Sequence, residues 1–124
     1  MSAVVVGYGM AGVRVAEELH RRGLSVTVLG AEPHRPYNRI LLSSVLAGAT
    51  READVILPES AGIDVRRGVA AVSIDRVRRL VTAADGTSVA YDALVLATGS
   101  KPVIPTIKGL TREDGALIAG ATGF

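Results

Sequence analysis

The stretch VVVGYGMAG, residues 4–12, decides the fold of this chain. Residues 3–6 form a short apolar, β-branched run closed by glycine, which predicts a buried strand. Residues 10–22 show apolar positions at helical spacing, and Gly23 follows where a helix commonly ends. Residues 25–29 (SVTVL) then predict a second strand. Together these segments predict a β-α-β unit, in which two parallel strands are joined by a right-handed crossover.

The glycines of this stretch have the spacing G-x-G-x-x-G, and each has a separate mechanical role. Gly7 makes the tight turn after the strand, Gly9 lets the backbone approach a pyrophosphate, and Gly12 lets the helix pack close to the strands. The helix N-terminus at Met10 and Ala11 adds free N–H groups and a partial positive charge. Because the motif follows a strand and opens a helix, it predicts a dinucleotide site at these five residues. The alternative is a purely structural glycine turn.

An acidic partner for the ribose is expected near the end of the second strand. Gly30 occupies the usual position, and Glu32 follows two residues later. We predict that the Glu32 carboxylate accepts hydrogen bonds from both ribose hydroxyls, and the alternative is a solvated loop side chain. The strand end carries no arginine for a 2′-phosphate, so the sequence gives no support for an NADP preference.

The remainder of the chain predicts a change from parallel to antiparallel structure. A proline-containing loop over residues 30–38 leads to a short buried helix over 40–47 and a further helical turn within 50–57. Asp85-Gly86 is a strong hairpin signal between strand-like segments. The predicted strands are residues 63–65, 69–74, 80–83, 88–91 and 93–97. Those over 69–91 predict an antiparallel meander.

This order, a meander followed by ALVLATG at residues 93–99, resembles the FAD domain of flavoprotein reductases with two dinucleotide folds. That family includes pyridine nucleotide–disulfide reductases, ferredoxin reductases and the flavin-binding part of nitrite reductase. GAEP at residues 30–33 and YNRILLSSVLAG at 37–48 are most similar to the large subunit of NAD(P)H-dependent nitrite reductase. The fold class implied is α/β, a Rossmann-like FAD/NAD(P)-binding domain with a β-α-β unit and a meander, incomplete at the C-terminus. It would occupy residues 1–110, and residues 111–124 form an atypical tail.

The resemblance also implies roles for individual residues. The glycine loop would hold the FAD pyrophosphate and Glu32 the adenosine ribose. Arg39 would reach the phosphate or ribose side, with a solvent-exposed loop arginine as the alternative. Backbone groups at Ala71 would pair with the adenine edge, and Ala97, Thr98 and Gly99 would line the cofactor. Ser43 and Ser44 stand where ferredoxin reductases carry Ser-Lys, which favours the nitrite reductase branch and leaves no catalytic residue assigned in this chain.

The family continues into an NAD(P)H-binding domain and then a Gly-Asp motif, and neither is found in these 124 residues. We therefore expect an FAD-binding portion of an NAD(P)H-dependent oxidoreductase, truncated and not catalytically complete alone. NAD(P)H would be the family co-substrate, and a second chain or a homo-oligomer would complete the site. The alternatives are a non-catalytic module that binds FAD, NAD or ADP, and a truncated remnant.

Composition excludes several other classes. The absence of cysteine rules out disulfides, thiolate metal sites and iron–sulfur ligation, and two separated histidines do not predict a metal site. The net charge of +2 and few aromatic residues argue against nucleic-acid binding. No apolar run reaches the roughly 18 residues of a membrane span, so we expect a cytoplasmic protein.

Overall fold

The computed structural model describes residues 1–122 and contains the predicted β-α-β unit. Strand β1 (Ser2–Val6), helix α1 (Met10–Arg21) and strand β2 (Ser25–Gly30) form it, and β1 pairs with β2 in parallel. Two further parallel strands complete a sheet of order β3-β2-β1-β7, namely β3 (Asp64–Arg67) and β7 (Ala93–Leu96). The first and last parts of the domain therefore meet side by side at β1.

The predicted meander is confirmed as a separate antiparallel sheet of order β4-β5-β6. The tight turn between the last two strands is fixed by Asp85, whose carboxylate accepts from the N–H of Thr87 at 2.9 Å and from its hydroxyl at 2.7 Å. The strands are β4 (Ala71–Asp75), β5 (Leu80–Ala83) and β6 (Ser88–Ala90).

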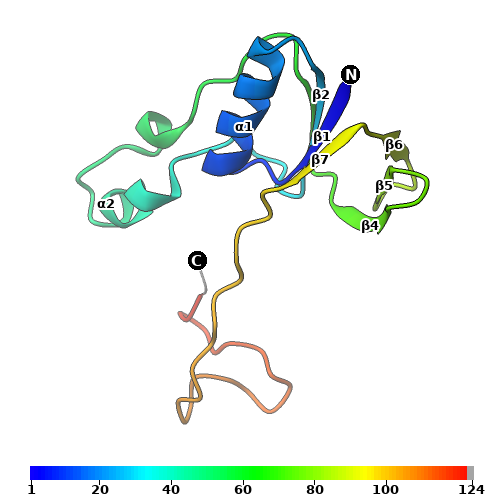
Figure 1. Ribbon diagram of the computed structural model, residues 1–124. Coiled ribbons are helices and arrows are strands. Elements are labelled where there is room, and N and C mark those ends of the chain that lie inside the picture. The colour runs from blue at the N-terminus through cyan, green and yellow to red at the C-terminus, as the bar shows by residue number, and fades with distance from the viewer. Residues whose placement is uncertain (123–124) are drawn as a thin grey trace.

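The parallel sheet lies between α1 on one face and the meander on the other (Figure 1). Successive valines of β1 point to opposite faces of the sheet. Val5 packs with Ala16 of α1, whereas Val4 and Val6 pack with Val81 of β5. A strand covered on both faces reads as a continuous apolar run rather than an alternating one. This explains the sequence of β1.

The helical turns of the connection between β2 and β3 lie away from both sheets (Figure 1). This connection contains a short 3-10 turn η1 (Arg39–Leu41), helix α2 (Leu42–Leu46) and a second 3-10 turn η2 (Glu52–Val55). The prediction of a buried helix here is wrong, because Ile40 and Leu46 are 73% and 72% exposed. Apolar composition without a helical period over several turns could not tell burial from exposure.

Beyond β7 the chain runs away from the two sheets as an extended tail (Figure 1). Its pairing is limited to an isolated bridge between Thr111 and Leu117, among the residues that the structure describes. The proposed boundary between residues 110 and 111 stays a prediction.

Candidate dinucleotide site

A cavity of about 350 Å³ lies at the carboxyl ends of β1, β2 and β7. In open α/β sheets this edge is where ligands bind. The cavity falls within the size range of small-molecule sites, about 300–1,000 Å³. Its lining comes from the glycine loop, the start of α1, the loop after β2 and the segment after β7, and consists of Gly7, Tyr8, Gly9, Met10, Ala11, Gly30, Ala31, Glu32, His34, Arg35, Pro36, Tyr37, Arg39, Ala97, Thr98 and Gly99.

Two glycines of the motif are required by backbone contacts. Gly7 has a φ of +107°, and a Cβ there would collide with the carbonyl group of Ala97. A Cβ on Gly12 would collide with the carbonyl oxygen of Gly7. The turn, the first turn of α1 and the end of β7 thus approach so closely that positions 7 and 12 have no room for a side chain.

Gly9 differs from these two, because a Cβ at this position would meet nothing within 4 Å. Its φ of −85° is also open to any residue. Neither backbone strain nor packing explains a glycine here. The free space lies in the wall of the cavity, which fits a backbone that must leave room for a closely approaching group.

The N-terminus of α1 faces this space. The first helical hydrogen bond joins the N–H of Val13 to the carbonyl of Gly9 at 2.9 Å, so the preceding N–H groups have no partner within the helix. No side chain of the described residues caps this end, and no acidic residue lies in the first turn. Free N–H groups and the positive end of the helix dipole suit an anionic group such as a pyrophosphate.

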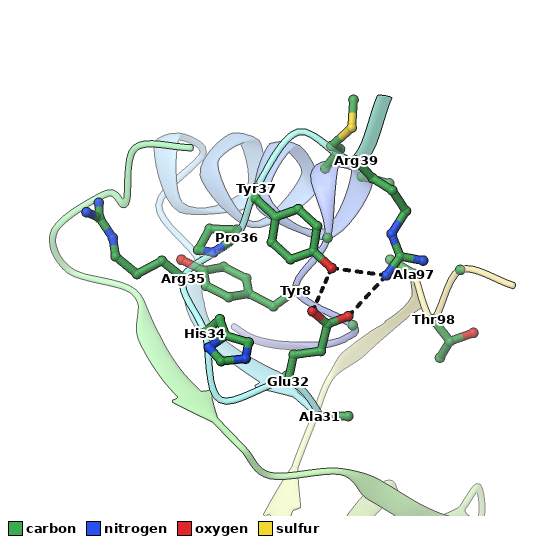
Figure 2. A pocket seen from close by; sticks show the side chains of 16 residues that line it. Tyr8, Ala31, Glu32, His34, Arg35, Pro36, Tyr37, Arg39, Ala97 and Thr98 are labelled. Carbon is green, nitrogen blue, oxygen red and sulfur yellow. Dashed lines mark hydrogen bonds and ion pairs between the residues drawn. The ribbon is translucent and has the colours of Figure 1, made fainter. Parts of the chain in front are cut away.

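A cluster of polar side chains from the loop after β2 and from η1 lines the same cavity (Figure 2). The hydroxyl of Tyr37 donates to Oε2 of Glu32 at 2.9 Å, and Arg39 donates to Oε1 of Glu32 at 3.2 Å. Arg39 also donates to the Tyr37 hydroxyl at 3.2 Å, and its guanidinium lies 5.9 Å from the centre of the Tyr37 ring. The hydrogen bond to Tyr37 and the charge of Glu32 raise the pKa of Arg39 above its ordinary value. The Glu32 carboxylate is thus held in one orientation with its remaining lone pairs free to accept.

The ring of Tyr8 forms the wall behind the cluster. A Cβ added to Gly30 would lie only 2.9 Å from the Cβ of Tyr8. Glycine at the end of β2 therefore makes room for Tyr8. Burial, the charge of Glu59 and a hydrogen bond to its carboxylate raise the pKa of Tyr8 to about 12. Tyr8 is a neutral phenol throughout the physiological pH range.

The structure brings most of the predicted site residues to one place. Gly12 lies behind the wall, packed against Gly7, and the rest of the predicted glycine loop lines the cavity with Glu32, Arg39 and residues 97–99. Ala71 does not line it: this residue belongs to β4, pairs with Ala83 and packs against the core. Neither Ser43 nor Ser44 is part of the lining.

Sequence reasoning missed His34, Arg35 and Pro36 as lining residues. The available signal was position: a proline-rich loop that directly follows a central parallel strand must cross the carboxyl edge of the sheet. The loop is secured there by backbone bonds from Asn38 to Val55 at 2.7 Å and from Leu57 to Pro36 at 2.8 Å.

Comparison with known proteins agrees with this geometry. The family model of pyridine nucleotide-disulphide oxidoreductases matches residues 1–122. The nitrite reductase [NAD(P)H] of Bacillus subtilis (strain 168) is 39% identical over 129 residues, covering 98% of this chain and 15% of the relative. The assimilatory nitrate reductase electron transfer subunit of the same organism is 38% identical, covering 89% of this chain and 15% of the relative. The crystal structure of a covalent putidaredoxin reductase–putidaredoxin complex matches at a TM-score of 0.77 with 31% identity, covering 88% of this chain and 28% of that one.

The chain therefore belongs to the pyridine nucleotide-disulphide oxidoreductase family, with the Rossmann-like fold that the sequence predicted. Its homologues include nitrite reductase and ferredoxin reductases, as expected from the resemblance. It spans about 15% of the length of these nitrite and nitrate reductase relatives. No helix among the described residues is long and apolar enough to cross a membrane.

Proposed function

We propose that the cavity binds the ADP half of FAD, and that this chain is the FAD-binding portion of an NAD(P)H-dependent flavoprotein oxidoreductase. The single observation that carries the proposal is the space beside Gly9. A glycine that neither strain nor packing requires lies in a cavity wall, directly before a helix N-terminus without a side-chain cap. A pyrophosphate that approaches the backbone accounts for all of these features.

The polar cluster supplies the second part of the proposed site. The Glu32 carboxylate, oriented by Tyr37 and Arg39, would accept hydrogen bonds from the adenosine ribose. The guanidinium of Arg39 would stay paired with Glu32, and its positive charge would offset part of the negative charge of the phosphates. Ala97, Thr98 and Gly99 would contact the cofactor through the backbone where β7 ends. Ala71 lies outside the cavity lining, and we do not include it in the proposed contacts.

When bound, FAD would supply the hydride-transfer chemistry, and the protein would supply binding and orientation. Hydride transfer from NAD(P)H needs a nicotinamide placed against the flavin. We propose that this second nucleotide site comes from a further segment or from a second chain, as the share of the relatives' length covered by this chain suggests. Electrons would pass from NAD(P)H through FAD to an acceptor.

Titration of the purified chain with FAD, followed by the flavin absorbance and fluorescence, tests the proposal. We expect saturable binding by the unchanged chain and a loss of at least 100-fold in affinity for Gly9→Val, because the added side chain occupies the pyrophosphate space. The matched control is Ala47→Val, which adds bulk at an exposed position outside the cavity and should bind FAD normally. A chain without affinity for FAD, or a Gly9→Val variant that binds like the unchanged chain, would contradict the proposal.

A further inference from the structure

The carboxylate of Glu59 is contacted by three side chains from separate parts of the chain. It accepts from the Tyr8 hydroxyl at 3.3 Å and from Nε of Arg35 at 3.0 Å, and a guanidinium nitrogen of Arg67 lies 3.7 Å away. The Glu59 side chain is only 25% exposed. The next residue, Ser60, fixes this segment to α1, because its hydroxyl donates to Glu17 at 2.9 Å.

Two of the side chains bound to Glu59, Tyr8 and Arg35, also line the nucleotide cavity. Figure 2 shows that the guanidinium of Arg35 points away from the cluster of Glu32, Tyr37 and Arg39. The stem of Arg35 thus belongs to the wall, while its charge is directed outward. The ion pair with Glu59 is the contact that holds it there.

The charges around the cavity are therefore matched in pairs. Arg39 is paired with Glu32 and Arg35 with Glu59, and these two are the arginines of the described lining. A carboxylate faces the ribose side, and no uncommitted guanidinium stands beside it. This arrangement favours a ribose with free hydroxyls, because a 2′-phosphate would meet the charge of Glu32 while the neighbouring guanidinium of Arg39 is already paired with that carboxylate.

We propose that Glu59 is a specificity-determining residue: by holding the guanidinium of Arg35 outside the cavity, it makes the site select nucleotides with a free 2′-hydroxyl over those with a 2′-phosphate. The inference rests on the proposed nucleotide site and adds a residue that lies outside the cavity lining. Without Glu59, the guanidinium of Arg35 loses this ion pair and is free to turn toward the ribose side, because Arg35 lies on the same loop as Glu32. Arginine is suited to bind phosphate there through charge-assisted hydrogen bonds.

The test compares ADP-ribose with 2′-phospho-ADP-ribose, which contain the ADP half shared with FAD and differ only in the 2′-phosphate. Calorimetry should show that the unchanged chain prefers ADP-ribose. In Glu59→Gln and Glu59→Ala the ratio of the two affinities should shift about tenfold toward the 2′-phosphorylated ligand, the size expected for one charge-assisted hydrogen bond. Two substitutions are used so that a folding defect in one leaves the other informative, with circular dichroism as the check.

Three control variants separate this role from structural effects. Arg35→Gln/Glu59→Gln should lose the shift, because the released guanidinium is absent. Arg67→Gln removes the 3.7 Å ion pair with Glu59 and keeps the one with Arg35, so its ratio should stay that of the unchanged chain. Glu113→Gln removes the same charge at an exposed tail position and should also leave the ratio unchanged.

The outcomes distinguish the two proposals. If the unchanged chain binds FAD and Glu59→Gln and Glu59→Ala keep its ratio of affinities, the role of Glu59 is refuted and the nucleotide site stands. If the shift persists in Arg35→Gln/Glu59→Gln, Arg35 is not the group that Glu59 restrains, and the inference is refuted. An unchanged chain that binds neither FAD nor ADP-ribose refutes the nucleotide site and, with it, the inference.

Discussion

Gly7 and Ala97 come from opposite ends of the domain, and their backbones are in direct contact at the edge of the parallel sheet. A Cβ on Gly7 would overlap the carbonyl group of Ala97 and would lie 3.0 Å from the amide nitrogen of Thr98. The contact exists because β7 pairs with β1, and the N–H of Ala97 donates to the carbonyl of Val6 at 2.7 Å. The glycine loop and the Ala-Thr-Gly segment thus form one wall.

The first prediction concerns this contact. Gly7→Ala should lower the free energy of unfolding by about 2 kcal/mol or more, because alanine meets both a left-handed φ and a backbone collision. Gly23→Ala is the control, since Gly23 has a φ of +84° with nothing within 4 Å of its Cβ position. Urea denaturation measures both. Equal losses in the two variants would show that the collision with Ala97 costs nothing.

The second prediction concerns the orientation of Glu32. Glu32→Gln should weaken the binding of ADP-ribose about tenfold, because a hydrogen bond to a charged acceptor is lost. Tyr37→Phe should cause a smaller loss, since the carboxylate stays but loses the donor that fixes its Oε2 at 2.9 Å. Calorimetry gives the affinities, and denaturation should show unfolding free energies within about 0.5 kcal/mol of the unchanged chain, as expected for exposed pairs. A Glu32→Gln variant with unchanged affinity would remove Glu32 from the site.

The third prediction concerns alkaline pH. The pKa of Tyr8 is about 12 in the folded protein, mainly because of burial and the charge of Glu59, against 10.0 for an ordinary tyrosine. A raised pKa means that the neutral phenol is favoured by folding. Its contribution is therefore fully present below pH 10 and is lost as the pH rises toward 12.

Denaturation at a series of alkaline pH values checks this. The free energy of unfolding should fall more steeply between pH 10 and 12 in the unchanged chain than in Tyr8→Phe, which has no phenol to ionise. Tyr91→Phe, at another partly buried tyrosine, controls for the general effect of removing a phenol hydroxyl. Parallel curves for the unchanged chain and Tyr8→Phe would contradict the assigned pKa.

The fourth prediction concerns acidic pH at the start of the sheet. The carboxylate of Asp92 accepts from the backbone N–H of Ser2 at 2.7 Å and from its hydroxyl at 3.0 Å, and these bonds lower the pKa of Asp92. A lowered pKa stabilises the folded protein above the ordinary value of about 4, and this contribution is lost as the pH falls through the folded value. Asp92→Asn should therefore show a flatter dependence of unfolding free energy on pH below about 4.

Ser2→Ala separates the two donors to Asp92. It removes the hydroxyl and keeps the backbone N–H, which is the larger cause of the lowered pKa. Its acid dependence should lie between those of the unchanged chain and Asp92→Asn. An Asp92→Asn variant with the full acid dependence of the unchanged chain would show that another carboxylate is responsible.

Local sequence was sufficient for the elements whose signals are periodic or sterically strict. The β-α-β unit was specified by the apolar run of β1, the G-x-G-x-x-G spacing and the helical period up to Arg21. The last hairpin of the meander was specified by the Asp85-Gly86 turn. The segment around α2 is exposed, whereas its apolar sequence predicts burial. Burial there depends on whether another element covers the segment, and apolar composition does not contain that information.

The succession of strand, glycine turn and helix follows from local sequence, because it depends on neighbours within one or two turns of chain. Which distant residues share the cavity depends on tertiary pairing. The parallel pairing of β7 with β1 brings Ala97 to Gly7, and the loop after β2 brings Arg35 to Glu59. Tertiary pairing also packed Ala71 against the core cluster that contains Val81, rather than placing it at the cavity. Such contacts arise from the pairing and layering of sheets, which no local pattern encodes.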